Sequence, residues 1–177
     1  MGFKLMTPRL RIRSWRQDDV ASWGELCADP EVMRYFPKTL TPVEAMQWID
    51  NQQRIETKHG YCFWAIDLRD SGAFIGMTGL HPLHIEGIIS DGIEIGWRLH
   101  RAAWNKGYAT EAAKACRDYA RDELRCEKLY AVASEVNVNS IAIMKKLEME
   151  PVRKFVHPLL PLGSALQPCV LYSVAFC

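Results

Sequence analysis

The stretch Trp104-Asn-Lys-Gly-Tyr-Ala-Thr-Glu111 joins a strand-like run directly to a helical one. The run before it, 92–99, reads Gly-Ile-Glu-Ile-Gly-Trp-Arg-Leu, and small or apolar residues after it recur at the spacing of one buried helix face. Gly107 lacks a Cβ and Asn105 tolerates a left-handed backbone, so the chain can turn tightly here. The stretch therefore predicts a strand, a glycine loop and a helix start.

A helix start of this kind suits a phosphate group. The first amides of a helix have no partner inside it, and the helix dipole places partial positive charge there. Lys106 adds a full positive charge. The order Lys106-Gly107 is not a Walker loop, and the spaced glycines of a dinucleotide fingerprint are missing. An ordinary strand-to-helix turn is the alternative on geometry alone.

The residues of this loop resemble those of a known family. Residues 104–112, Trp-Asn-Lys-Gly-Tyr-Ala-Thr-Glu-Ala, resemble the acetyl-CoA pyrophosphate loop of the GNAT superfamily of acetyltransferases. They are most similar to the ribosomal-protein N-acetyltransferase (RimJ/RimL) branch, although Asn105 stands where that branch usually has glycine. The resemblance extends over nearly the entire chain, which implies a single GNAT domain over residues 1–177.

Composition sets the broad class. The chain has 177 residues, 49% hydrophobic and 24% charged, which is ordinary for a soluble domain large enough to bury a core. A net charge of +1 gives no sign of a nucleic-acid partner. No run approaches the length of a membrane span, and basic residues interrupt the N-terminal segment where a signal peptide would be apolar. We expect no membrane partner and a cytoplasmic location.

Cysteine and histidine patterns favour neither a metal site nor a thiol nucleophile. None of the six cysteines forms a CxxC pair, so reduced thiols are expected and a catalytic cysteine is the weaker alternative. They are Cys27, Cys62, Cys116, Cys126, Cys169 and Cys177. His81 and His84 are spaced as HxxH but have no ligand companions nearby, so no metal is predicted.

Periodicity and turn residues predict the order of elements. Strands are expected at 9–13, 61–68, 73–80, 92–99, 128–133, 152–156 and 169–176. Helices are expected at 17–28, from Thr41 to Gly60, after the glycine loop and at 137–147, with a short turn at 29–33. Segments 81–91 and 158–163 are expected to be loops. The resemblance implies an α/β (α+β) fold in which helices flank a mixed, mostly antiparallel central sheet.

The chain departs from the family pattern at two positions. Glu148 replaces the glycine that usually ends the last helix in a left-handed conformation, so this helix is expected to end differently, at a cost of about 1 kcal/mol. Met144 stands where many superfamily members carry a tyrosine general acid, and a thioether cannot donate a proton.

The resemblance implies acetyl-CoA as the acyl donor and assigns residues to it. Amides of the loop are expected to wrap the pyrophosphate, while the end of the preceding strand contacts the pantetheine arm. For Asn137, a plain helix N-cap is the alternative to a pantetheine contact. The predicted cofactor residues are Trp97, Leu99, Asn105, Lys106, Gly107, Tyr108, Ala109, Thr110 and Asn137.

Two residues are predicted to take part in catalysis. Glu94 points opposite to its apolar neighbours Ile93 and Ile95, and a carboxylate there suits a general base; a solvated strand face or a salt bridge is the alternative. Ser140 lies one helical turn before Met144 and is predicted to act on the leaving sulfur. Glu111 is expected to be structural.

The function predicted is transfer of acetyl from acetyl-CoA directly to a primary amine, without an acetyl-enzyme intermediate. The acceptor is a protein or peptide N-terminus or a small amine, bound by 32–61 and 81–91, and the protein is expected to be a monomer or homodimer. A non-catalytic acyl-CoA-binding protein is the main alternative, and a generic phosphate or nucleotide binder is the third class.

Overall fold

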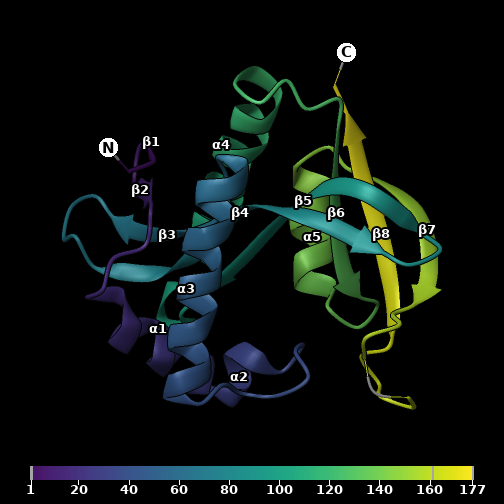
Figure 1. The fold of residues 1–177 in the computed structure, drawn as a ribbon, viewed down its shortest axis with the longest axis horizontal. Coiled ribbons are helices and arrows are strands. Elements are labelled where there is room, and N and C mark those ends of the chain that lie inside the picture. Colours follow the sequence, from purple (N-terminus) through teal and green to yellow (C-terminus); the bar gives the residue numbers. More distant parts are fainter. Residues whose placement is uncertain (1, 161, 177) are drawn as a thin grey trace.

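A computed structural model describes residues 2–160 and 162–176, which form a mixture of strands and helices (Figure 1). The elements are β1 (Lys4–Met6), β2 (Leu10–Arg13), α1 (Asp19–Ala28), α2 (Pro30–Met33), α3 (Pro42–His59), β3 (Phe63–Leu68), β4 (Phe74–Ile85), β5 (Ile89–Leu99), a 3₁₀ turn (Arg101–Ala103), α4 (Tyr108–Asp122), β6 (Lys128–Ser134), α5 (Val138–Lys146), β7 (Glu150–Val156) and β8 (Pro168–Ala175). Cys177, and Pro161 of the loop expected at 158–163, lie outside the described residues.

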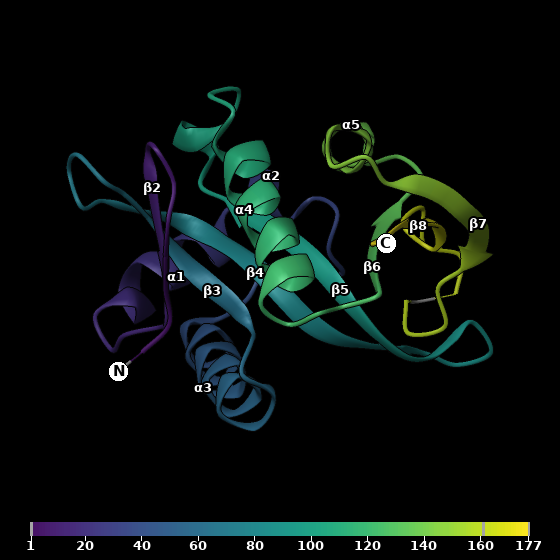
Figure 2. The ribbon, with the colours of Figure 1, turned by 90° about the horizontal axis from the view of Figure 1, so that it is seen from above.

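One sheet of eight strands runs through the described residues in the order β1-β2-β3-β4-β5-β6-β8-β7. Every neighbouring pair is antiparallel except β5 and β6, which are parallel. Helices α1 and α3 cover one face of the sheet, while α4 and α5 lie on the other (Figure 2). The predicted fold class is therefore confirmed: helices flank a mixed, mostly antiparallel sheet.

Local chemistry explains where the longest helix begins and ends. The Thr41 hydroxyl accepts from the Glu44 amide, and the Glu44 carboxylate accepts from the Thr41 amide, which forms the expected capping box. Pro42 occupies the first turn, where its missing N–H is not needed. Gly60 ends the helix at φ 78°, in the left-handed region that favours glycine. The start and the end of α3 are therefore those predicted from the sequence.

The prediction of a loop over 81–91 is wrong. Strand β4 continues through Pro82 to Ile85, and β5 begins at Ile89, so only a short turn separates them. Leu83 and Ile85 are buried in a second apolar cluster with residues of β7 and β8, including Phe155 and Leu171. Burial of these side chains stabilises the strand, although His81, Pro82 and His84 interrupt the apolar pattern that would predict it. The short strand β1, Lys4–Met6, was also not predicted.

The end of α5 also differs from the expectation. Glu148 itself adopts φ 62°, so the chain leaves the helix in the left-handed conformation that glycine would have taken. The Glu148 carboxylate accepts from Arg117 Nη1 at 2.7 Å, and the same nitrogen donates to the Leu147 carbonyl. Helix α4 thus holds the end of α5 in place. Helix α5 therefore ends in the left-handed conformation, contrary to the expectation that Glu148 would end it differently.

A buried ion-pair network ties the first strands to α1. The Arg13 guanidinium donates to both carboxylate oxygens of Asp19 and both of Asp67, all at 2.7 Å. Arg11 donates two further bonds to Asp67, at 3.1 and 2.8 Å. Burial opposes the charged form, but the bonds to Asp19 and Asp67 outweigh it and raise the pKa of Arg13.

In the described part of the chain, no helix is long and apolar enough to cross a membrane.

Replacing Asp67 with Ala is expected to destabilise the protein by about 3–5 kcal/mol, because Arg13 is left buried with one carboxylate fewer. Chemical unfolding followed by fluorescence measures this free energy. Asp50→Ala is the matched control, since Asp50 lies on the exposed face of α3, and its effect should stay within about 0.5 kcal/mol. Equal losses for the two variants would show that the network contributes nothing.

Candidate functional site

The glycine loop has the geometry that its residue types predict. Asn105 lies at φ 59° and Gly107 at φ 79°, both left-handed, and α4 begins at the next residue, Tyr108. The Trp104 indole donates to the Leu99 carbonyl at 2.9 Å, which fixes the start of the loop to the end of β5. Free amides at the first turn of α4 therefore face the space in front of the loop.

The loop is fastened to the N-terminal strands by one carboxylate. Glu111 accepts from the Thr7 hydroxyl at 2.6 Å and from the Arg9 amide and Nε at 2.9 and 2.6 Å. Arg9 also donates to the Lys106 carbonyl at 2.9 Å and lies over the Tyr108 ring. Burial raises the pKa of Glu111, but these hydrogen bonds outweigh it and lower the pKa. Glu111 has the structural role expected, and the contribution of Arg9 was not foreseen.

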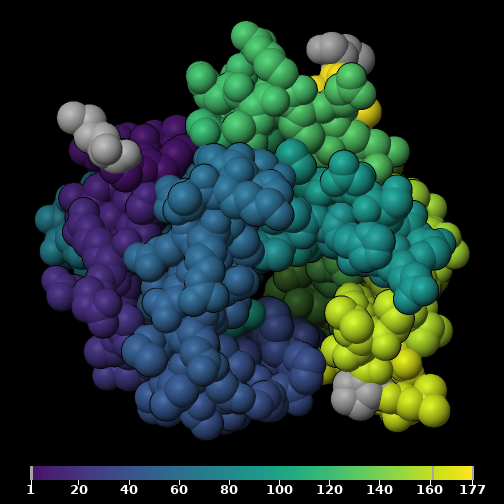
Figure 3. Space-filling view, viewed as in Figure 1, coloured from purple at the N-terminus to yellow at the C-terminus, as the bar shows by residue number. Residues whose placement is uncertain are grey.

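A cleft of about 680 Å³ opens beside this loop. Its walls come from the α2 segment, the end of β5, the glycine loop and α5, and Figure 3 shows the molecule hollowed between the blue α2–α3 segment and the yellow-green C-terminal loop. Nine of the predicted residues line it: Trp97, Leu99, Asn105, Gly107, Tyr108, Ala109, Thr110, Asn137 and Ser140. The cleft thus brings together residues from four separate parts of the sequence.

Two predicted residues do not line the cleft. Lys106 lies in the loop, where its carbonyl accepts from Arg9, and it is not part of the wall. Glu94 lies farther back along β5, opposite His81 of β4 in the strand register. Asn137 lines the cleft but also caps α5, because its side-chain oxygen accepts from the Ser140 amide at 3.2 Å. Both interpretations of Asn137 therefore have a structural basis.

The environment of Glu94 raises the pKa of its carboxyl group. Its side chain is 23% exposed, and burial raises its pKa to about 7. The His81 Nδ1 lies 3.8 Å from the Glu94 carboxylate but is hydrogen-bonded to the Pro82 carbonyl at 2.8 Å, and burial lowers the pKa of His81. A neutral imidazole does not stabilise the ionised carboxylate, so Glu94 exchanges a proton near neutral pH.

The expected acceptor segments contribute to the cleft only in part. Residues 31–36 form one wall, with Phe36 and Tyr35 among the lining side chains, whereas no residue of 81–91 is among those that line it. Arg98 also lines the cleft and was not singled out. The only sequence signal for Arg98 was its even position on the same strand as Glu94, which places both side chains on one face.

The cysteines that the structure describes are free and weakly acidic. Cys27, Cys62, Cys116, Cys126 and Cys169 are free, and burial raises the pKa of each, to about 12 for Cys116 and about 11 for Cys169. In residues 2–160 and 162–176, no group of three or more histidine, cysteine or acidic side chains is arranged to hold a metal ion.

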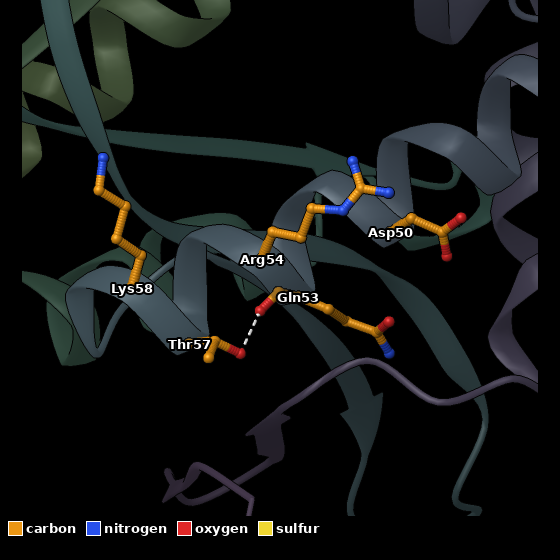
Figure 4. Close-up of a pocket in the computed structure, with 5 residues that line it drawn as sticks. All are labelled: Asp50, Gln53, Arg54, Thr57 and Lys58. Carbon is orange, nitrogen blue, oxygen red and sulfur yellow. Dashed lines mark hydrogen bonds between the residues drawn. The ribbon is translucent and has the colours of Figure 1, made fainter.

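A second, shallow depression runs along the outer side of α3 (Figure 4). Its five side chains, Asp50, Gln53, Arg54, Thr57 and Lys58, come from one helix face. The sticks in Figure 4 point apart rather than toward a common centre, and the one bond drawn is from Thr57 to the Gln53 carbonyl. This is a solvated helix surface, so the cleft is the candidate site.

Comparison with known proteins gives the family. Residues 9–150 match the family described as acetyltransferase (GNAT) domain. The uncharacterised protein YkkB of Bacillus subtilis (strain 168) is 34% identical over 160 residues, which cover 88% of this chain and 92% of YkkB. The chain therefore belongs to the GNAT acetyltransferase family, which confirms the resemblance of the loop.

Solved structures confirm the fold at lower identity. A GNAT-family acetyltransferase from Bacillus anthracis superposes with a TM-score of 0.83 at 24% identity and covers 98% of both chains. RimL, a ribosomal L7/L12 alpha-N-protein acetyltransferase solved with coenzyme A, gives a TM-score of 0.78 at 13% identity, with 97% of both chains covered. At these identities, the two comparisons show that the fold is shared.

Gly107→Val is expected to abolish the rise in melting temperature that acetyl-CoA produces, since a ligand of the native state stabilises it by mass action. The new side chain would stand where the pyrophosphate is predicted to approach, and thermal unfolding with and without acetyl-CoA measures the effect. Gly72→Val is the control, because Gly72 has a similar φ of 71° and open surroundings. A folded Gly107→Val protein with an unchanged shift would exclude this loop as the binding site.

Proposed function

We propose that the protein is an N-acetyltransferase that moves the acetyl group of acetyl-CoA directly to a primary amine. The observation that supports this most is the cleft itself, which joins the amides at the start of α4 to Ser140 on α5. A cofactor with its pyrophosphate at the first site and its thioester at the second would span the two. The opposite wall, from the α2 segment, leaves room for an acceptor.

The loop amides and the dipole of α4 suit the pyrophosphate, and Lys106 and the Thr110 hydroxyl add charge and a donor. Trp97, Leu99 and Asn137 are proposed to contact the pantetheine arm, through the end of β5 and the start of α5. An extended arm needs such backbone partners, because its amides lose their water when it enters the cleft.

Glu94 is the proposed general base and Ser140 the proposed donor to sulfur. The amine nitrogen forms a bond to the thioester carbon and loses one proton toward Glu94, directly or through one water. The carbon–sulfur bond breaks, and the Ser140 hydroxyl stabilises the thiolate that leaves. A pKa of about 7 suits a base at neutral pH. Met144, which is 1% exposed, contributes packing only.

Direct transfer is supported by the state of the thiols. A cysteine nucleophile needs its pKa lowered, yet burial raises the pKa of all five described cysteines. Free thiols also fit the reducing cytoplasm, the compartment we propose. The acceptor is a protein or peptide N-terminus, as for the alpha-N-protein acetyltransferase RimL, or a small amine. The chain is proposed to act as one domain, as a monomer or homodimer.

Release of free CoA in the presence of a panel of amines and N-terminal peptides tests this proposal. We expect CoA release to depend on the amine, with the acetylated amine identified by mass spectrometry and no acetyl group left on the protein. Tight binding of acetyl-CoA without release, for every acceptor, would instead indicate a non-catalytic acyl-CoA-binding protein. An acetylated cysteine on the turnover path would exclude direct transfer.

Glu94→Gln and Ser140→Ala are each expected to lower kcat by about tenfold or more while the affinity for acetyl-CoA holds. In the wild type, kcat should fall as the pH drops below about 7, because protonation removes the base, whereas Glu94→Gln should lack this step. Ser140→Thr keeps the hydroxyl and serves as the control for Ser140→Ala. Near-wild-type turnover of Glu94→Gln across the pH range would show that Glu94 is structural.

A further inference from the structure

Arg98 is a cation without a counterion inside the candidate site. Its guanidinium lies against the Phe36 ring, at 3.8 Å from the ring centroid, and 5.2 Å from that of Trp23. Its Nη1 has one weak partner, the Cys27 sulfur at 3.5 Å. Among residues 2–160 and 162–176, no carboxylate lies within ion-pair distance of Arg98.

Two buried hydrogen-bond donors, one on Arg98 and one on Trp23, lack an acceptor. The Arg98 Nε and the indole Nε1 of Trp23 are the only buried side-chain nitrogen or oxygen atoms without a partner in the described part of the chain. An unpaired buried donor costs free energy comparable to a lost hydrogen bond, and more when the group is charged. Both atoms donate and neither accepts, and of the two residues only Arg98 lines the cleft. An acceptor-only group that carries negative charge and enters the cleft therefore suits Arg98.

The position of Arg98 favours the acceptor substrate over the phosphates of acetyl-CoA as the source of this negative charge. Side chains alternate along β5, so Arg98 shares with Glu94 the face that α1 covers, while Trp97 and Leu99 point to the face of α4. The glycine loop begins α4 on that second face. Arg98 and the glycine loop therefore line one cleft from opposite faces of the sheet, and the acceptor is the better source of an anion at Arg98.

We infer that the acceptor is an amine that also carries a carboxylate, and that Arg98 binds this carboxylate. The inference rests on the proposed function. Arg98 and Phe36 both line the cleft, so a carboxylate that enters it can reach the guanidinium. Glu94 and Arg98 are four residues apart, about 13 Å along the strand at about 3.3 Å per residue. This span favours an amine and carboxylate separated by several bonds over an α-amino acid.

Three pairs of acceptors test this inference, each an acid and its neutral amide: alanine and alaninamide, glycylglycine and its amide, 6-aminohexanoate and its amide. For the wild type, kcat/KM of the best acid should exceed that of its amide by about tenfold or more, as expected for charged hydrogen bonds. Arg98→Met should lower kcat/KM for that acid about tenfold more than for its amide. Arg54→Met, on the exposed face of α3, is the matched control and should keep the preference.

Amides that serve as well as acids in all three pairs would overturn the inference, as would an equal loss for acid and amide in Arg98→Met. Arg98→Lys keeps the charge but not the Nε donor, and should retain part of the preference if Arg98→Met does not fold.

Calorimetric titration of the CoA-bound protein with the three acids separates this inference from the proposed function. If no amine releases CoA, the proposed function fails, while binding of an acid that is lost in Arg98→Met still supports an anion site at Arg98. Failure of all three acids to bind the wild type would exclude it.

Discussion

The parallel pairing of β5 with β6 is the constraint on which the cleft depends. The two strands pair at Ile93–Leu129 and Glu94–Tyr130, and each then continues with a different partner. Strand β6 pairs with β8 along all of its residues, while β5 stays with β4 to Leu99. Because β5 has no neighbour on its β6 side beyond Glu94, the space there opens between α4 and α5. Its free backbone groups are available to an extended ligand.

The glycine loop and the long helices could be predicted because their causes are local. Asn105 and Gly107 are residue types that accept a positive φ, and Thr41 with Glu44 encodes a helix start within four residues. The continuation of β4 to Ile85 could not, because its stabilising contacts come from Phe155 and Leu171, far along the chain. Glu148 at φ 62° shows the same limit, since Arg117 on another helix holds it.

The two halves of the candidate site differ in the same way. The proposed pyrophosphate site consists of consecutive loop residues whose backbone conformation follows from their types, so a family resemblance locates it. The proposed acceptor half is assembled by cross-strand register and helix packing, which bring Phe36 and Trp23 onto Arg98. The direction of the Glu94 side chain could be predicted from the sequence, because strict alternation between Ile93 and Ile95 places it on the opposite face of the strand. No pattern in the sequence singles out Arg98 as unpaired, because pairing is a property of the folded chain.

The spacing along β5 also explains how one strand carries the proposed base Glu94 and the cation Arg98 without either neutralising the other. Gly96 separates them, and a Cβ there would lie 2.8 Å from the Phe63 ring, so the strand can pack against this ring only with glycine. The two charged groups are then about 13 Å apart along the strand. At that separation Arg98 does not offset the desolvation of Glu94, and burial alone sets its pKa near 7. If Arg98 lay close to Glu94, it would favour the ionised carboxylate and lower its pKa, and the base would be too weak to take a proton from an amine.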